Sequence, residues 1–196
     1  MTADEPLEHR WPRPPRDGYT VGDLFTLPEL PSRTELIDAG LVFASPQCMF
    51  HACVVDLLVD GVRRDRPDTL DVIRNMTVVL DDRNGLAPDV SLVRTEAVTG
   101  PDQMSFRPQD VLLAVEVVSP DSESRDRTTK PQKYAAAGIP NFWRVERGGN
   151  GDEPVVHVYE LGPLTKAYVH MGMQRGQLKV DKPCTLEIVL DRARRD

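Results

Sequence analysis

Two carboxylates stand at the ends of predicted strands, where acidic side chains could meet. Asp89 follows Pro88 directly after a turn and begins a predicted strand. Glu116 lies in the apolar run Val111–Val118, where a charge is unusual because such a run is typical of a strand buried on both faces. Two acids that meet repel each other unless one is protonated or a cation lies between them. Oxygen ligands of this kind favour a hard divalent ion such as Mg²⁺.

A lysine follows on the next predicted helix. Asp126, Lys130 and Tyr134 are spaced four residues apart, which brings their side chains near one face of that helix. An ammonium group close to two carboxylates could orient or deprotonate an attacking water, or stabilise the charge on a phosphate. Together with bound Mg²⁺, these groups would suit metal-assisted hydrolysis of a phosphodiester.

The elements that would position these groups follow from hydrophobic periodicity and turn residues. An amphipathic helix is predicted from Cys48 to about Val62, because its apolar residues recur at helical spacing. A second helix, over 126–137, should end at Gly138, with Pro140 just beyond. Strands are predicted over 35–45 (a strand or hairpin), 70–80, 90–93, 111–118 and 141–146, with a turn over 81–88 and short antiparallel strands in 155–190. We therefore predict an α/β or α+β fold, with a mixed central sheet flanked by helices and antiparallel strands at the C-terminus.

The composition is that of an ordinary globular domain of 196 residues, with a net charge of −7. We expect a flexible Pro-rich arm over 1–20 and a single domain over 21–196. The sequence has no apolar run of membrane-spanning length and no secretory signal near its first residues, so we expect a cytoplasmic protein. Three cysteines without a C-x-x-C pair argue against a disulfide scaffold or a structural zinc site. The acidity argues against a non-specific nucleic-acid coat protein.

Three segments carry a family pattern: ELIDAGLVFASPQCMFH, APDVSLV and LLAVEVVSPDSESRDRTTKPQKYAAAGIPNFWRVE. Together they resemble the Uma2 family (DUF820) of the PD-(D/E)xK, restriction-endonuclease-like superfamily. The most specific part joins E-V-x-S-P to D-x-x-x-K-x-x-x-Y and G-I-P-x-(F/Y)-W, and the resemblance covers roughly residues 20–190. It implies a restriction-endonuclease-like fold and an endonuclease that cleaves DNA with Mg²⁺ or Mn²⁺. By analogy with such folds, it also implies a homodimer.

The resemblance implies catalytic roles for four residues. Asp89 matches the Asp of the PD element and Glu116 matches the acid of (D/E)xK, so both would bind the metal. The usual lysine position, two residues after that acid, holds Val118 here. Lys130 matches the lysine that takes over from the following helix in Uma2-like sequences, and would orient the water. Glu35 matches an early glutamate that such nucleases often bring to the metal site.

Other residues would support these four. His51, Asp126 and Tyr134 also match family positions, and the last two would help to position the lysine. Basic residues close to the site are candidates for phosphate contacts, namely Arg125, Arg127 and Lys133. Taken singly, a residue such as His51 is more often a helix-surface or partly buried residue than a ligand, and one such as Tyr134 is more often a core aromatic than a functional group.

Each catalytic candidate also has a purely structural interpretation. Asp89 is a common residue type at a turn or strand start, and Glu116 could form an ion pair at a strand end. Lys130 alone would usually be a solvated helix residue, and Asp126 could be the N-cap of its helix. Only the joint occurrence of these residues in family order favours a functional site.

Two other functions remain open from the sequence. One is a non-catalytic binding or scaffold protein that keeps the nuclease-like fold, and the other is a hydrolase of another phosphoester such as RNA. A Lys130 side chain in solvent, or an Asp89 far from Glu116, would favour the scaffold. The sequence predicts no zinc finger, helix-turn-helix or aromatic stacking platform, so any specificity must come from loops of the fold or from a partner.

Overall fold

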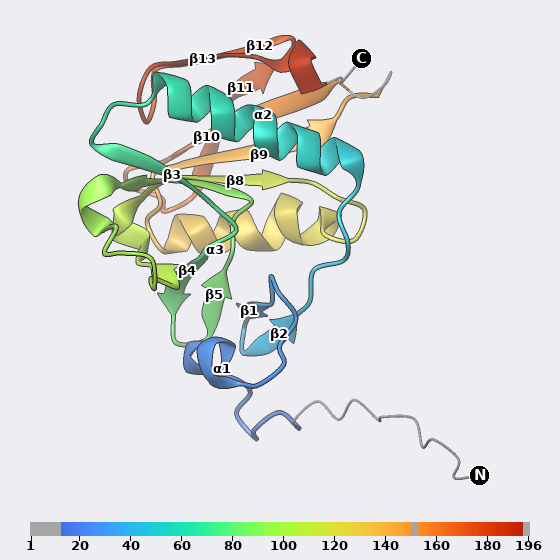
Figure 1. The fold of residues 1–196 in the computed structure, drawn as a ribbon, viewed down its shortest axis with the longest axis vertical. Helices are drawn as coiled ribbons and strands as arrows, with labels where there is room; N and C mark the ends of the chain where they lie inside the picture. The colour runs from blue at the N-terminus through green and yellow to red at the C-terminus, as the bar shows by residue number, and fades with distance from the viewer. Residues whose placement is uncertain (1–12, 150–152, 194–196) are drawn as a thin grey trace.

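The computed structural model describes residues 13–149 and 153–193 (Figure 1). Within them the chain forms two mixed sheets and a separate hairpin, with helices packed against them. The helical segments are α1 (Val21–Thr26), α2 (Met49–Asp65), the π-helix η3 (Arg125–Thr129), α3 (Lys130–Ala136), which continues η3, and the 3-10 turns η1 (Thr95–Ala97), η2 (Pro108–Asp110) and η4 (Leu190–Ala193).

The larger sheet has six strands in the order β11-β10-β9-β8-β6-β3. They are β3 (Leu70–Arg74), β6 (Val90–Arg94), β8 (Val111–Val117), β9 (Asn141–Arg147), β10 (Pro154–Leu161) and β11 (Tyr168–Gln174). Strands β8 and β9 are parallel, and the other neighbouring pairs are antiparallel. The parallel pair is connected through η3 and α3, because parallel neighbours need a crossover.

The smaller sheet has five strands in the order β2-β1-β5-β4-β7. They are β1 (Glu35–Ile37), β2 (Gly40–Val42), β4 (Thr77–Asp81), β5 (Asn84–Leu86) and β7 (Ser105–Phe106). The C-terminal hairpin consists of β12 (Gln177–Val180) and β13 (Leu186–Val189). It packs closely on α2, where a Cβ atom added to Gly61 would lie only 2.7 Å from Ile188 Cγ1.

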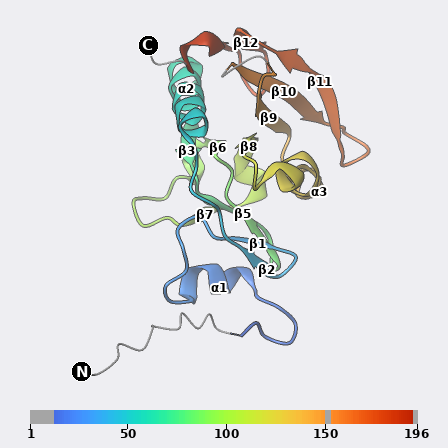
Figure 2. The same cartoon turned by 90° about the vertical axis from the view of Figure 1, so that its right-hand side faces the viewer.

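Each face of the larger sheet has its own helix, because successive residues of a strand point to opposite faces (Figure 2). Trp143 of β9 packs in the same hydrophobic cluster as α2. The neighbouring Phe142 packs with Tyr134 of α3 in the second cluster. Glu116 of β8 pairs in register with Arg144, two residues beyond Phe142, so both point to the α3 face. The buried strand therefore presents its single acid to the helix that carries Lys130.

The α+β organisation, the long helix, the strand over 111–118 and the C-terminal antiparallel strands are confirmed. The prediction of one strand over Leu70–Leu80 is wrong. This segment forms β3 and β4, which belong to different sheets, and the chain turns between them at Asn75 with φ of 50°. Asparagine tolerates this left-handed conformation better than most residues, so the apolar run is interrupted there. The predicted turn over 81–88 contains a further short strand, β5.

The N-terminal arm was predicted to be flexible over 1–20, and residues 1–12 lie outside the described part. Within 13–20, Tyr19 is buried and its N–H donates to the Ala39 carbonyl, so this end of the arm is attached to the domain. In the described ranges, we find no helix long and apolar enough to cross a membrane.

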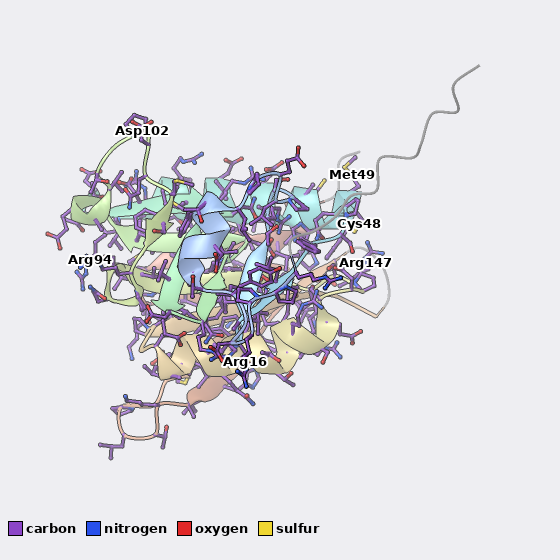
Figure 3. All side chains as sticks on the ribbon, turned by 90° about the horizontal axis from the view of Figure 1, so that it is seen from below. Arg16, Cys48, Met49, Arg94, Asp102 and Arg147 are labelled. Carbon is purple, nitrogen blue, oxygen red and sulfur yellow. The ribbon has the colours of Figure 1, made fainter. Side chains whose placement is uncertain are left out.

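All three cysteines are free thiols, as the sequence predicts. Cys48 immediately precedes α2 and lies beside the end of β9, where the Arg147 guanidinium donates to its Sγ at 3.9 Å (Figure 3). The same guanidinium covers the Phe50 ring at 4.6 Å. These contacts join the start of α2 to the sheet.

Candidate active site

A polar pocket lies where the two sheets meet the η3–α3 segment. It brings together ionisable residues from β1, α2, β6, β8 and the crossover helix. Its charged or ionisable lining residues are Arg33, Glu35, His51, Asp89, Glu116, Asp121, Arg125, Asp126 and Lys130. The predicted residues Asp89, Glu116, Lys130 and Glu35, together with His51 and Asp126, thus line one pocket although the sequence separates them widely.

Lys130 lies among three carboxylates. Its Nζ is 3.1 Å from Glu35 Oε1, 3.1 Å from Glu116 Oε2 and 3.3 Å from Asp126 Oδ1. Burial by itself would lower the pKa of this lysine, but the surrounding carboxylates, Glu116 first, hold it well above its usual range. Lys130 is therefore an ammonium group at neutral pH, able to donate hydrogen bonds but not to accept a proton.

Glu116 is fully enclosed by protein. Its Oε2 accepts from Lys130, and its Oε1 accepts a hydrogen bond of 2.6 Å from the Tyr134 hydroxyl. Burial raises the pKa of Glu116 well above its usual range, and the neighbouring carboxylates of Asp126 and Asp89 raise it further. A buried acid beside other acids favours its neutral form. A cation bound beside Glu116 would compensate the charge of the ionised form and so stabilise that form.

Asp89 has the opposite balance, because three donors surround it. Its Oδ1 accepts from Arg33 at 2.6 Å, while its Oδ2 accepts from His51 Nε2 at 3.1 Å and from the Val117 N–H at 2.8 Å. Burial opposes ionisation here too, but the hydrogen bond and the charge of His51, with the Val117 N–H, keep the pKa of Asp89 below its usual value. Asp89 is thus held as a carboxylate.

Backbone groups fix the orientation of two of the acids. The Ala87 N–H donates to Glu35 Oε1 at 2.8 Å, across from β1. Val117, at the end of β8, donates its N–H to Asp89 at the start of the neighbouring β6. Both contacts involve the ends of strands, where backbone donors leave the sheet ladder and become free for side chains.

Asp126 is not the N-cap of its helix, contrary to one interpretation of the sequence. It lies inside η3, where one oxygen accepts from the Ser122 hydroxyl. Its Oδ1 is buried and has no hydrogen bond, and Lys130 is the cation beside it. Burial raises the pKa of Asp126, although Lys130 and the Ser122 hydroxyl oppose the rise.

The donor set of the pocket has the chemistry that a divalent cation prefers. Four buried carboxylates face Lys130 and Arg33, while Arg125 in the pocket lining pairs with Asp121. Excess buried negative charge is costly unless it is protonated or neutralised by a metal. Among the described residues, no three acidic, histidine or cysteine side chains are grouped so that they could hold a metal ion as they stand. The residues fit a hard cation by charge and by their oxygen donors, and the side chains would have to turn toward the ion to bind it.

The three residues predicted to contact phosphate lie in different surroundings. Arg125 lines the pocket and lies 3.6 Å from Asp121. Arg127 points elsewhere and bonds to the Glu146 carboxylate. Lys133 also lies outside the pocket and bonds to Asp38 at 2.6 Å.

Sequence reasoning missed several pocket residues. Arg33 lies two residues after Pro31, in a short segment that gave no signal. Ser119, Asp121 and Ser122 form a hydrogen-bonded loop at the pocket edge. Ser119 belongs to the E-V-x-S-P string, so the family pattern contained a signal for this loop. The spacing of the loop residues alone indicates no function for them.

A family model decides the classification of this chain: the model of Uma2, described as "Putative restriction endonuclease", matches residues 21–192. The chain belongs to the Uma2 family. A crystal structure of a "putative nuclease belonging to DUF820" from Anabaena variabilis ATCC 29413 has a similar fold. The two chains are 16% identical and superpose with a TM-score of 0.62 over 84% of this chain and 89% of the other. No curated protein sequence matches this chain.

The Uma2 chain has its lysine in an unusual place relative to the (D/E)xK pattern. Val118 occupies the expected lysine position, two residues after Glu116. The ammonium that reaches Glu116 comes instead from Lys130, fourteen residues later in the chain. In this Uma2 fold, the crossover helix supplies the cation that the strand does not.

Proposed function

We propose that this protein is a metal-dependent endonuclease that hydrolyses DNA phosphodiester bonds. The observation that supports this most is the position of the Lys130 ammonium, within 3.3 Å of Glu35, Glu116 and Asp126. Membership of Uma2 and the similarity to a DUF820 fold support the same activity. A scaffold protein would have no need to bury so many acids beside one lysine.

Asp89 and Glu116 would hold a Mg²⁺ or Mn²⁺ ion, with Glu35 beside them. When bound, such an ion supplies Lewis acidity toward a phosphate oxygen and lowers the pKa of a coordinated water. Asp89 is suited to this role because its hydrogen bonds keep it ionised. Glu116 is suited because a cation would neutralise a charge that burial disfavours.

Lys130 would act as a charged donor rather than as a base. Its raised pKa keeps the proton on Nζ, so the ammonium would orient the attacking water or neutralise charge that develops on the phosphate. Asp126 is the better proton acceptor. Burial raises its pKa toward the working pH, as general-base catalysis requires, and its Oδ1 lies 3.3 Å from the Lys130 ammonium that would orient the water.

The experiment is a cleavage assay on supercoiled plasmid and on short labelled DNA, with Mg²⁺, Mn²⁺ or EDTA. Wild type is compared with Lys130→Ala and with the matched control Lys179→Ala, a surface lysine on β12. We expect metal-dependent cleavage by wild type and the control, and a loss of at least about 100-fold in Lys130→Ala, the usual scale for one transition-state donor.

The alternatives give different outcomes. Cleavage of RNA but not DNA under the same conditions would make the protein a hydrolase of another phosphoester. Cleavage that survives Lys130→Ala would contradict the role of the lysine while keeping the enzyme. Absence of cleavage with every metal and both substrates would favour the scaffold.

A further inference from the structure

A second polar surface lies on the other side of the crossover helix from the pocket. The α3 face of the sheet continues there across β9, β10 and β11, beyond the edge of the helix (Figure 2). A groove runs between the helix and the β10–β11 loop. We call the basic and aromatic residues of this face the outer platform, which consists of the exposed Lys166 and His170 and the half-buried Arg144, His157 and Tyr159.

Aromatic rings lie beside one another along this platform in tilted arrangements. The centroid of the Tyr159 ring lies 5.0 Å from that of His170 and 5.5 Å from the Arg144 guanidinium carbon. The His157 and His170 rings are 5.6 Å apart. His170 is exposed, whereas His157 and Tyr159 are half-buried, so His170 is the ring most open to solvent. The sequence did not predict this cluster, because its members come from two strands that antiparallel pairing aligns.

One lysine of the platform is left without a counter-charge. Arg127 and Arg144 both bond to Glu146, and Arg127 also pairs with Glu123, so these two arginines face two carboxylates. Lys166, in the β10–β11 loop, is exposed and forms no ion pair with any residue in the described ranges. An exposed ring beside an unpaired cation is what single-stranded nucleic acids bind through their bases and phosphates.

The platform lies close to the candidate active site. Glu116 on β8 is in register with Arg144 on β9, which is in register with His157 on β10. Since neighbouring strands are about 4.8 Å apart, the backbone at His157 is roughly 10 Å from that at Glu116. The crossover helix lies between the pocket and the platform, so a strand bound at both would pass around this helix.

We infer that the outer platform binds single-stranded nucleic acid that extends from the active site, with a base stacked on His170 beside Tyr159 and a phosphate bound by Lys166. The inference deepens the proposed function, and rests on it for the identity of the substrate. A duplex hides the faces of its bases inside its own stack, so stacking on these rings requires an unpaired strand.

The test is binding without cleavage, measured in EDTA by fluorescence anisotropy of a labelled oligothymidylate of about 12 nucleotides and of a matching duplex. His170→Ala removes an exposed ring and should raise the Kd for the single strand about 5-fold or more. Lys166→Glu should weaken binding several-fold and make its salt dependence less steep. The control Lys179→Glu makes the same charge change on β12. It should weaken binding by a smaller factor than Lys166→Glu does.

Three results would overturn the inference: no binding by wild type, equal binding of single strand and duplex, or equal losses in Lys166→Glu and Lys179→Glu. The readout is independent of the proposed function because it needs no metal and no turnover. If single strands bind through the platform and nothing is cleaved, the platform stands and the nuclease activity fails. If cleavage occurs and His170→Ala changes neither Kd nor KM, the nuclease stands and the platform fails.

Discussion

The two flanks of the η3–α3 segment differ in how their charged side chains are arranged. On the pocket side, Lys130 is buried among carboxylates that outnumber the cations around them. On the outer side, Arg127 and Arg144 share Glu146 at the surface, where Arg127 also meets Glu123. The same short helix thus separates a closed acidic cluster from a more exposed one in which two arginines face two glutamates.

This difference determines which charged contacts contribute most to the free energy of unfolding. Surface ion pairs are screened by water and contribute about 0–1 kcal/mol. Buried charges are screened little, so removing one partner leaves the others uncompensated. We therefore expect single substitutions in the pocket, changes of pH and divalent cations to change the free energy of unfolding strongly. Substitutions in the outer network of Arg127, Arg144 and Glu146 should change the free energy of unfolding little and should act mainly on binding.

The largest effect is expected from Lys130→Met, which removes the buried cation and leaves Glu35, Glu116 and Asp126 facing one another. We expect the free energy of unfolding to fall by about 3–5 kcal/mol, the usual cost of breaking a buried ion pair. Urea denaturation at neutral pH measures it. A change below about 1 kcal/mol would mean that the pocket charges are solvated and that the contrast between the two flanks is wrong.

Glu116→Gln should have the next largest effect, and in the opposite direction. It removes a negative charge that burial disfavours while keeping the shape of the side chain. Without divalent cations we expect a gain of about 1 kcal/mol, which is about 2–4 °C in Tm for a domain of this size. The stabilisation by Mg²⁺ that we expect in wild type should be lost, because a proposed ligand is gone. Thermal melts with EDTA and with Mg²⁺ measure both, and a lower Tm in EDTA would contradict the prediction.

The pH dependence of stability should separate the two acids. The folded-state pKa of Glu116 is raised, so its contribution is full at low pH and is lost as the pH rises through that pKa. The pKa of Asp89 is lowered, so its contribution is present above its unfolded value and is lost as the pH falls. Metal-free wild type should be most stable at a pH above the range in which Asp89 is protonated and below the range in which Glu116 ionises. The urea midpoint should fall less steeply with rising pH in Glu116→Gln than in wild type. An unchanged fall would assign this pH dependence to another group.

The smallest effect on stability is expected from Arg127→Ala on the outer flank. Its ion pairs with Glu123 and Glu146 are partly exposed, so we expect a change within about 0.5 kcal/mol. The same urea denaturation measures it, and raising the salt concentration should reduce even this difference. A loss as large as that of a pocket substitution would show that the outer network is structural.

Much of the pocket could be predicted because local patterns and long-range pairing agree there. The apolar run around Glu116 required a buried strand, and the spacing of Asp126, Lys130 and Tyr134 required a shared helix face. A parallel crossover from β8 then brings that helix face back onto its own strand. The roles of these residues remain proposals, since proximity alone does not establish catalysis.

Other features depend on contacts that have no local signal. Arg33 reaches Asp89 across 56 residues of sequence, and nothing around it marks a partner. The break at Asn75 depends on which sheet each half of an apolar run joins, and both halves have strand composition. The ring cluster depends on the register of β10 with β11, which turn geometry and packing decide.

The π-helical start of the crossover has a consequence for how this domain tolerates changes in length. In η3 the N–H of Lys130 donates to the carbonyl of Arg125, five residues earlier, so this turn holds one residue more than an α-helical turn of the same span. Deleting one residue here would restore α-helical winding over the same span, so the segments on either side would keep their relative orientation. If the deleted residue lay between Asp126 and Lys130, these two would be three residues apart and would still lie on one face of the helix. The domain can therefore lose one residue in this turn and keep its acid and its lysine together.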